Sequence, residues 1–407
     1  MAALTLEQLA RRAQATTEQI ARLERLGILV PTHGQAPHTA GDVRRVRLAN
    51  ACEQAGLPLE RIGAAIASGR LSFAFMNATA WTMVETTDTT YRELGAELDL
   101  PAELVQHVYQ AAGLGRPRAD DPIRSQDRDI LALFGYARRL GVDDGALVRA
   151  ARLYGQNLRR ISQGEDRLHH DYVETPLLAS GMDERQMGEA VTRTSAEITP
   201  LAERMLLALY QRHREHALVD HSVEHVEAAL DASGLGQPRL ARPPAMCFLD
   251  LAGYTRLTEE RGDRVAAELA TGLADLVEGI SLRHGGQPVK WLGDGVMLHF
   301  ADPGWGVLAA LEMVDRTAEA ELPAAHVGLH AGPVIFQDGD YYGRTVNLAA
   351  RIAAHAGPGQ VLVSDHVVAE TRTGEVAFEP VGPVRLKGVS STVALHRALR
   401  AAARSTS

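Results

Sequence analysis

The sequence predicts an α+β protein with a ferredoxin-like β-α-β-β-α-β domain at its C-terminus and an all-α region before it. Apolar residues recur at helical spacing through most of residues 1–232. From residue 245 the pattern changes to short apolar runs typical of strands, which alternate with helical stretches. This order of elements forms a sheet covered by helices on one face.

Length and composition restrict the class of protein. The 407 residues are enough for two or three domains, and the net charge of −9 disfavours a protein that coats nucleic acid or anionic membrane. Cys52 and Cys247 fit neither a disulfide framework nor a zinc-site spacing. No apolar run reaches the roughly 18 residues of a membrane span, and the start shows no signal-peptide pattern. We expect a cytoplasmic protein with no membrane span.

Residues 1–72 form the first predicted domain, with Thr16 and Thr17 as an N-cap signal and Gly27 as a stop. Four short helices are predicted, over 6–14, 17–26, 40–55 and 59–67. The domain resembles the winged helix-turn-helix of the MerR transcription regulators. The resemblance is carried by residues 4–10, 20–29, 42–45 and 55–62.

The stretches that would touch DNA depart from the MerR pattern. MerR proteins usually carry Arg-Tyr-Tyr or similar in the recognition helix and Arg-x-Tyr in the wing, where this chain has Ala21-Arg22-Leu23 and Gln35-Ala36-Pro37-His38. Residues 1–70 hold nine arginines against six acidic residues, few for phosphate contacts. A regulatory or dimerisation role is favoured over DNA binding.

Residues 73–232 read as a helical regulatory domain. Helices are predicted over 102–111, 126–140, 144–159, 184–197 and 199–233. Prolines cluster between these runs, at Pro101, Pro117, Pro122 and Pro176. Residues 233–244 follow as a linker, because glycine and proline interrupt any helix there.

The last predicted helix carries four of the 16 histidines within 13 residues: His213, His216, His221 and His225. Three interpretations stay open. The histidines can belong to a solvated polar face among neighbouring charges. His221 and His225, four residues apart, can hold a metal ion. The cluster can also sense protons, because the ordinary pKa of histidine is about 6.5.

The domain at 245–400 begins with an apolar strand, residues 246–249, that delivers Asp250 at its tip. A helix over 255–284 follows, then a strand over 287–292, a turn at 293–295 and a return strand over 296–300. A second helix is predicted over 305–320 and a further strand over 326–331. This order places Asp294 beside Asp250. Two neighbouring carboxylates repel unless a cation lies between them, and oxygen ligands of this kind suit Mg²⁺ or Mn²⁺.

Lysine is rare in this chain. Lys290 and Lys387 are the only two lysines among 42 basic residues. Either two lysines survived by chance, or lysine is retained where a compact ammonium is needed. Lys290 lies four residues before Asp294. Farther on, a helix beginning near residue 346 would place Asn347 and Arg351 side by side, where an amide and a guanidinium can hold a sugar and a phosphoryl oxygen.

Three motifs resemble the catalytic motifs of the class III nucleotidyl cyclases: residues 248–255, 290–295 and 340–351. They occur in that family's order and with its separations, and the resemblance covers about residues 244–398. It implies that Asp250 and Asp294 bind two metal ions per active site, Mg²⁺ or Mn²⁺, with the carbonyl of Leu251 as a further ligand.

The resemblance also implies roles at the nucleotide. Lys290 and Asp340 would read adenine, Asn347 would orient the ribose and Arg351 would stabilise charge at the α-phosphate. Lys387 would hold the terminal phosphates. Guanylyl cyclases typically carry Glu and Cys at the base-reading pair, so ATP is the implied substrate.

The resemblance implies a homodimer, in which one chain supplies the metal aspartates and the other the base- and phosphate-reading residues. The implied function is an adenylate cyclase that makes cyclic AMP and pyrophosphate from ATP. The helical N-terminal half resembles that of the autoinhibited, acid-responsive bacterial cyclases. The alternative is a transcription regulator whose cyclase-like domain senses nucleotide.

Overall fold

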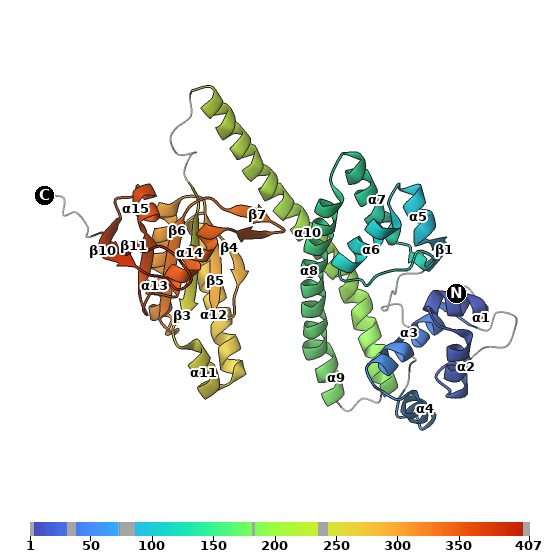
Figure 1. Cartoon of the computed structure of the whole chain (residues 1–407). Coiled ribbons are helices and arrows are strands. Elements are labelled where there is room, and N and C mark those ends of the chain that lie inside the picture. The colour runs from blue at the N-terminus through green and yellow to red at the C-terminus, as the bar shows by residue number, and fades with distance from the viewer. Residues whose placement is uncertain are drawn as a thin grey trace. The chain divides into compact units, whose positions relative to one another are not determined.

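The computed structural model describes residues 4–30, 38–71, 73, 86–180, 184–234 and 243–401 (Figure 1). The chain divides into two compact units, Met1–Val219 and Asp220–Ser407, and each is described by itself. Within the described residues, no helix is both long and apolar enough to cross a bilayer.

The first unit begins with the four predicted helices: α1 (Leu6–Ala13), α2 (Thr17–Arg25), α3 (Ala40–Gln54) and α4 (Leu59–Ala67). Capping boxes start α1 and α2, in which Thr5 pairs with Gln8 and Thr16 with Gln19. These helices bury a core of their own, which includes Leu9, Ile20, Leu23 and Val46. The helix predictions are confirmed. The wing stretch at residues 35–37 lies outside the described residues, so the MerR-like interpretation stays a hypothesis.

A second core of this unit gathers around α5 (Tyr91–Glu97), α6 (Ala102–Ala111), α7 (Asp127–Arg139) and α8 (Asp144–His169). The expectation of an entirely helical region is wrong at one place. β1 (Thr86–Thr90) and β2 (Pro122–Arg124) pair as an antiparallel ladder. Four of the five residues of β1 are threonine, whose branched Cβ favours extended backbone.

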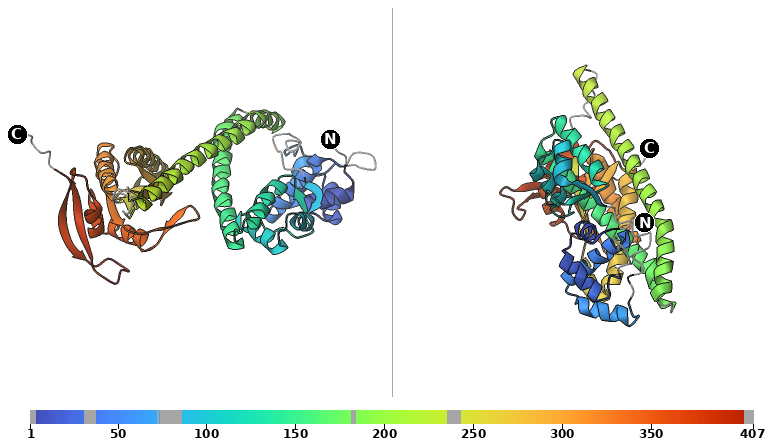
Figure 2. Two further views of the ribbon diagram at one scale, coloured as in Figure 1. Left: turned by 90° about the horizontal axis from the view of Figure 1, so that it is seen from above. Right: turned by 90° about the vertical axis from the view of Figure 1, so that its right-hand side faces the viewer.

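The longest helix is α10 (Glu184–Ala232), which follows a π-helical turn (His170–Glu174) and α9 (Thr175–Ala179) (Figure 2). Two helices were predicted here, with a break before Thr199, but the structure has one continuous helix with Pro200 inside it. The four histidines of α10 are all exposed. His221 and His225 lie one turn apart, with their Nε2 atoms at 2.9 Å.

The second unit contains a seven-stranded sheet in the order β10-β11-β9-β6-β3-β5-β4 (Figure 1). Its first four strands along the chain are β3 (Ala245–Leu251), β4 (Gly286–Trp291), β5 (Gly295–Phe300) and β6 (Ala325–Ala331). The order β6-β3-β5-β4 confirms the ferredoxin-like core. β9 (Val361–Ser364), β10 (Val376–Val384) and β11 (Val393–Arg400) extend the sheet beyond β6.

Helices cover both faces of this sheet, whereas one face was expected. Alternate residues of β3, such as Cys247 and Leu249, pack with α12 (Asp263–Arg283) and α13 (Pro303–Glu319). Met246 and Phe248 point to the opposite face and pack with Ala349 of α14 (Arg344–Ala353). The predicted helix over 255–284 is two helices, α11 (Tyr254–Arg261) and α12, because Gly262 has φ of +82°.

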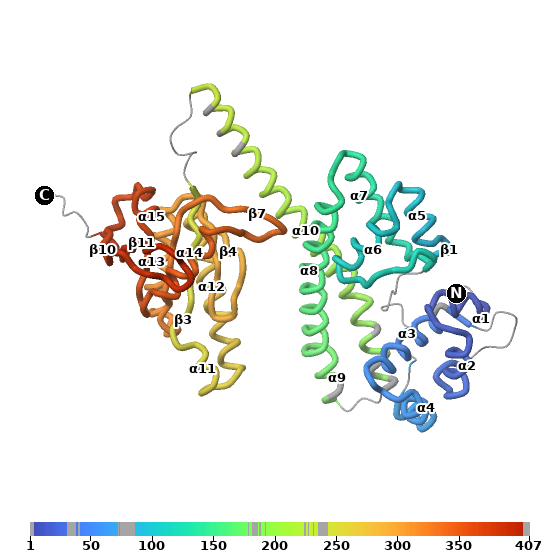
Figure 3. Tube along the Cα trace, viewed as in Figure 1, coloured from blue at the N-terminus to red at the C-terminus, as the bar shows by residue number. Residues whose placement is uncertain are grey.

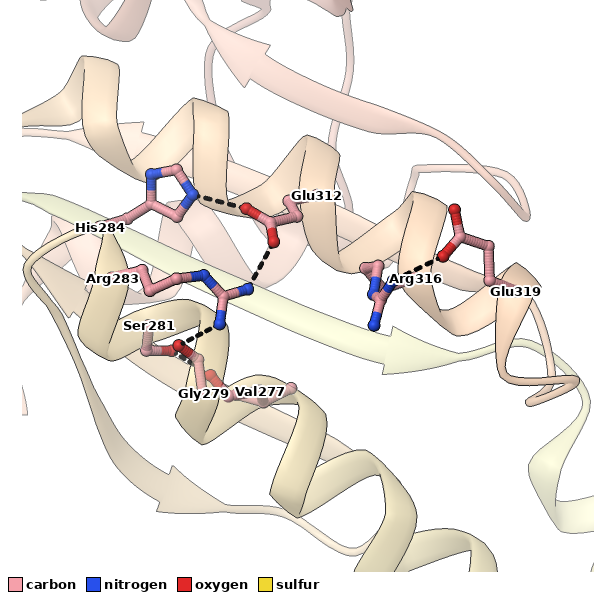
Figure 4. Close-up of polar contacts among 8 residues, drawn as sticks. All are labelled: Val277, Gly279, Ser281, Arg283, His284, Glu312, Arg316 and Glu319. Atoms are coloured by element: carbon pink, nitrogen blue, oxygen red, sulfur yellow. Dashed lines mark hydrogen bonds and ion pairs between the residues drawn. The ribbon is translucent and has the colours of Figure 1, made fainter.

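A polar cluster joins α12 to α13 on the outer side of the helical layer (Figure 4). Arg283 Nη2 and His284 Nε2 lie 2.5 and 2.8 Å from the two carboxylate oxygens of Glu312. The hydrogen bond from His284, followed by the contact with Arg283, holds the pKa of Glu312 below its usual value. α15 (Asp365–Glu370) adds Val367 to the core on this side.

One buried carboxylate organises the second core of the first unit. Asp127 is 4% exposed and accepts hydrogen bonds from Tyr91 (2.7 Å), Tyr109 (2.5 Å) and the backbone N–H of Arg124 (2.6 Å). Burial, together with this carboxylate, raises the pKa of both tyrosine hydroxyls.

We predict that Asp127→Ala lowers the free energy of unfolding of the first unit by about 3 kcal/mol, because it leaves buried donors without an acceptor. Urea denaturation measures the change. Asp129→Ala, at an exposed position of the same helix, is the matched control. Equal unfolding midpoints for the two variants would contradict the role of Asp127.

Candidate active site

Asp250 lies at the end of β3, between two antiparallel neighbours. In the register of the sheet it faces Gly295 of β5 on one side and His326 of β6 on the other. The apolar residues next to it in β3 are buried, so the strand is held in the core. The Asp250 side chain, by contrast, is 48% exposed. A buried strand therefore presents a carboxylate to solvent at its tip.

Asp294 occupies the turn between β4 and β5, directly before Gly295. The turn is closed by the N–H of Leu292, which donates to the carbonyl of Gly295 at 2.8 Å. Glycine is needed at 295, because a Cβ there would lie 2.8 Å from the carbonyl oxygen of Leu249 and 3.0 Å from Oδ1 of Asp250. The two carboxylates predicted as metal ligands are thus brought together.

The electrostatics of this pair favour a cation. Burial raises the pKa of the Asp250 carboxyl, and the nearby charge of Asp294 raises it further, while His326 and the N–H of Leu251 offset part of the effect. Unbalanced negative charge on hard oxygen donors suits a divalent ion. Within the described residues no third acidic, histidine or cysteine side chain completes a metal cluster. Backbone carbonyl, water and phosphate oxygens would supply the remaining ligands.

Lys290 and Asp340 meet although 50 residues separate them in the sequence. Lys290 Nζ lies 2.9 Å from Asp340 Oδ2, and the lysine side chain is 50% exposed. Asp340 begins β8 (Asp340–Tyr342), which pairs with β7 (Ile335–Gln337) as a two-stranded arm (Figure 3). Tyr341 of this arm stacks on His299 of β5, with ring centroids 4.6 Å apart and planes within 6°. This contact holds the arm against β5 of the sheet.

Asn347 and Arg351 lie on one exposed face of α14, four residues apart. Their orientation follows from burial of the opposite face, where Leu348 and Ile352 pack into a small core with Leu386. The helix begins two residues earlier than predicted, at Arg344, after Gly343 with φ of +129°.

Lys387 is placed less directly than the other predicted residues. It follows buried Leu386 in the connection between β10 and β11, and its side chain is exposed. The contacts of the described residues do not join it to Asp250, Lys290 or Arg351. Leu251, the predicted backbone ligand, is buried at the end of β3.

Sequence reasoning missed His326. Its Nε2 lies 3.9 Å from Oδ2 of Asp250, and its side chain is 14% exposed. The register of β3 with β6 puts the two residues opposite each other. A strand was predicted over 326–331, but its pairing with β3 does not follow from sequence periodicity.

We predict that Asp250→Asn raises the melting temperature of the metal-free protein at neutral pH. The raised pKa means that the folded chain disfavours the ionised carboxylate, so a neutral amide removes a cost that is present above this pKa. The gain should shrink as the pH falls through this pKa, because Asp250 is then also neutral. Calorimetry with chelator measures it, with exposed Asp275→Asn as the control. An unchanged or lower melting temperature at neutral pH contradicts the prediction.

The comparisons with known proteins agree with this geometry. The adenylate and guanylate cyclase catalytic domain matches residues 242–397. The pH-sensitive adenylate cyclase MT1302 of Mycobacterium tuberculosis is 29% identical over 335 residues, covering 79% of this chain and 81% of that protein.

Two further relatives are named adenylate cyclase. The protein of Glutamicibacter nicotianae is 30% identical over 302 residues, covering 70% of this chain and 72% of the relative. The protein of Streptomyces griseus is 31% identical over 300 residues, covering 70% and 68%. On this similarity, the chain belongs to the family of adenylate cyclases that carry the adenylate and guanylate cyclase catalytic domain.

Proposed function

We propose that this protein converts ATP to 3′,5′-cyclic AMP and pyrophosphate at a site built from the residues described above. The observation that carries the proposal is the juxtaposition of Asp250, at the end of β3, and Asp294, in the turn before β5. The two carboxylates need a divalent cation to offset their charge, and a nucleoside triphosphate is a substrate that brings further oxygen ligands.

Asp250 and Asp294, with the carbonyl of Leu251, would hold the metal ions. Bound there, two Mg²⁺ or Mn²⁺ ions would lower the pKa of the ribose 3′-hydroxyl and neutralise charge on the triphosphate. The charge of Asp294 disfavours ionisation of Asp250 in the metal-free chain, and bound cations would offset this repulsion between the two carboxylates.

Lys290 and Asp340 select the base. The ammonium donates and the carboxylate accepts, and adenine presents an acceptor, N1, beside a donor, the 6-amino group. Their 2.9 Å contact shows that both side chains reach the same point. The site therefore offers a matched donor and acceptor, and ATP is the proposed substrate.

Asn347 and Arg351 act at the sugar and the α-phosphate. The amide of Asn347 orients the ribose, and Arg351 donates to the phosphoryl oxygens whose charge grows during attack by the 3′-hydroxyl. A helix with one buried face presents both groups without reorganisation. Lys387 holds the terminal phosphates from the connection between β10 and β11.

Incubation of the full-length protein with ATP and Mn²⁺ should yield cyclic AMP and pyrophosphate. Arg351→Ala should lower kcat on the order of 100-fold, as loss of a transition-state donor does. Exposed Arg372→Ala is the matched control. Absence of cyclic AMP from the wild-type protein, or full activity of Arg351→Ala, contradicts the proposed function.

The active form is proposed to be a homodimer with two composite sites. Support comes from large apolar side chains exposed on the arm and at the end of β4: Trp291, Leu292, Ile335, Phe336 and Tyr342. They lie next to the Lys290–Asp340 pair, and a second subunit would cover them. In this arrangement Asp250 of one subunit works with Arg351 of the other.

Composite sites predict complementation. Asp250→Ala and Arg351→Ala should each be nearly inactive alone. A mixture that exchanges subunits should recover about a quarter of wild-type activity, because half of the dimers are mixed and each has one intact site. Cyclic AMP formation before and after mixing measures this. Continued inactivity of a mixture whose exchange is demonstrated shows that both groups act within one chain.

Regulation by the N-terminal half is proposed to respond to pH. Support comes from the relative named pH-sensitive, whose 335-residue match exceeds the catalytic domain and so reaches the N-terminal half. The four exposed histidines of α10 are the side chains to which we assign this response.

We predict that the full-length protein gains activity as the pH falls from mildly basic to mildly acidic, because protonation adds positive charge to histidine side chains. A fragment of residues 240–407 should lack this gain. Replacing His213, His216, His221 and His225 together by glutamine should reduce it, while exposed His355→Gln is the control. Identical pH–rate profiles of full-length protein and fragment contradict regulation by the N-terminal half.

A further inference from the structure

His326 lies between Asp250, at the end of β3, and the end of α14. Its Nδ1 lies 3.0 Å from the carbonyl oxygen of Ala353, the last residue of that helix. Its Nε2 lies 3.9 Å from Oδ2 of Asp250. One imidazole ring, mostly buried, therefore touches two parts of the proposed site that are about a hundred residues apart in the sequence.

The hydrogen bond determines how the ring is used. A carbonyl oxygen only accepts, so Nδ1 carries a proton and donates to Ala353. Nε2 is then the atom turned toward the carboxylate. At this distance the ring acts on Asp250 electrostatically, and a ring protonated at Nε2 as well would oppose the unfavourable effect of Asp294 on the ionised carboxylate.

The end of α14 is seated tightly on the same strand. Gly328 lies two residues beyond His326, and a Cβ added there would come within 2.0 Å of the backbone nitrogen of Ala353. Backbone therefore packs directly on backbone beside the hydrogen bond. Arg351 is two residues before Ala353, so this contact sets the position of its turn of the helix.

We propose that His326 is a positioning residue, which holds the Asp250 carboxylate and the last turn of α14 in a set relation to each other. The inference rests on the proposed function for its consequence. In the proposed homodimer, Asp250 and Arg351 of one chain serve different sites, so His326 connects the metal half of one site to the phosphate half of the other.

Two substitutions each remove one of the two contacts of the His326 ring. His326→Asn keeps a side-chain N–H near the position of Nδ1 and removes the atom that faces Asp250. His326→Gln places an amide near the position of Nε2 and removes the donor to Ala353. His326→Ala removes both. His355→Asn, exposed and two residues beyond Ala353, is the matched control.

Two measurements on the full-length protein report the two contacts of His326 without enzymatic turnover. Hydrogen exchange followed by mass spectrometry reports the last turn of α14. Electron paramagnetic resonance of free Mn²⁺ reports metal binding, and the Mn²⁺ concentration that gives half-maximal cyclic AMP formation is read alongside. Groups that orient metal ligands typically contribute 10- to 100-fold to metal affinity or activity.

We expect His326→Asn to keep wild-type exchange in α14 and to weaken Mn²⁺ binding about tenfold. His326→Gln should show the reverse, with faster exchange in residues 350–354 and a lower kcat. His326→Ala should show both changes. If His326→Ala does not fold, the Asn and Gln variants still test the positioning role of His326.

The proposal is overturned if all variants match His355→Asn in both measurements. It is also overturned if the Asn and Gln variants change both measurements equally, because the ring then has a merely structural role. A wild-type protein that makes no cyclic AMP would defeat the proposed function, while exchange and Mn²⁺ binding would still test His326.

Discussion

Repulsion between Asp250 and Asp294 is the constraint on which the catalytic unit depends. A chain that folds without its cation must tolerate two neighbouring carboxylates, one at the end of β3 and one in the turn before β5. It does so by leaving Asp250 about half exposed and by placing an imidazole at 3.9 Å. The buried faces of β3 supply the stability that offsets this cost, because Cys247, Leu249 and Leu251 lie in the main core. A charged group at an active site can stabilise a transition state in advance only if the surrounding core keeps that group in position.

The base-reading groups depend on a different kind of support. Asp340 lies on a two-stranded arm, and isolated two-stranded elements are marginally stable in water. Stacking of Tyr341 on His299 and the contact of Asp340 with Lys290 hold the arm to the sheet. Burial lowers the pKa of His299, which favours the neutral form of the ring that Tyr341 stacks on. The position of Asp340 therefore depends on aromatic packing behind it.

Much of this unit could be predicted from the sequence. The periodic runs predicted the ferredoxin-like topology. That topology puts Asp250 at the end of the first strand and Asp294 in the neighbouring hairpin, so it predicted that they meet. The contact of Lys290 with Asp340 agrees with their shared role in the family that the motifs resemble. Exposure of Asn347 and Arg351 on one face follows from their spacing of four.

Other features depend on tertiary packing that local patterns do not encode. A threonine-rich run pairs with Pro122–Arg124 far along the chain, so β1 was missed. Gly262 divides a stretch whose apolar spacing is continuous, since a positive φ is a property of the folded backbone. α14 covers the second face of the sheet because Met246 and Phe248 leave it apolar. His326 acquires its position only through the pairing of β6 with β3.

Gly328 restricts which amino-acid substitutions this domain can accept. Where a main chain rests on another main chain with no side chain between them, the gap cannot be refilled by compensating changes of size. Alanine at this position would lift the end of α14 away from β6 and carry the guanidinium of Arg351 with it. Gly328, which has no side chain, therefore determines where the guanidinium of Arg351 lies.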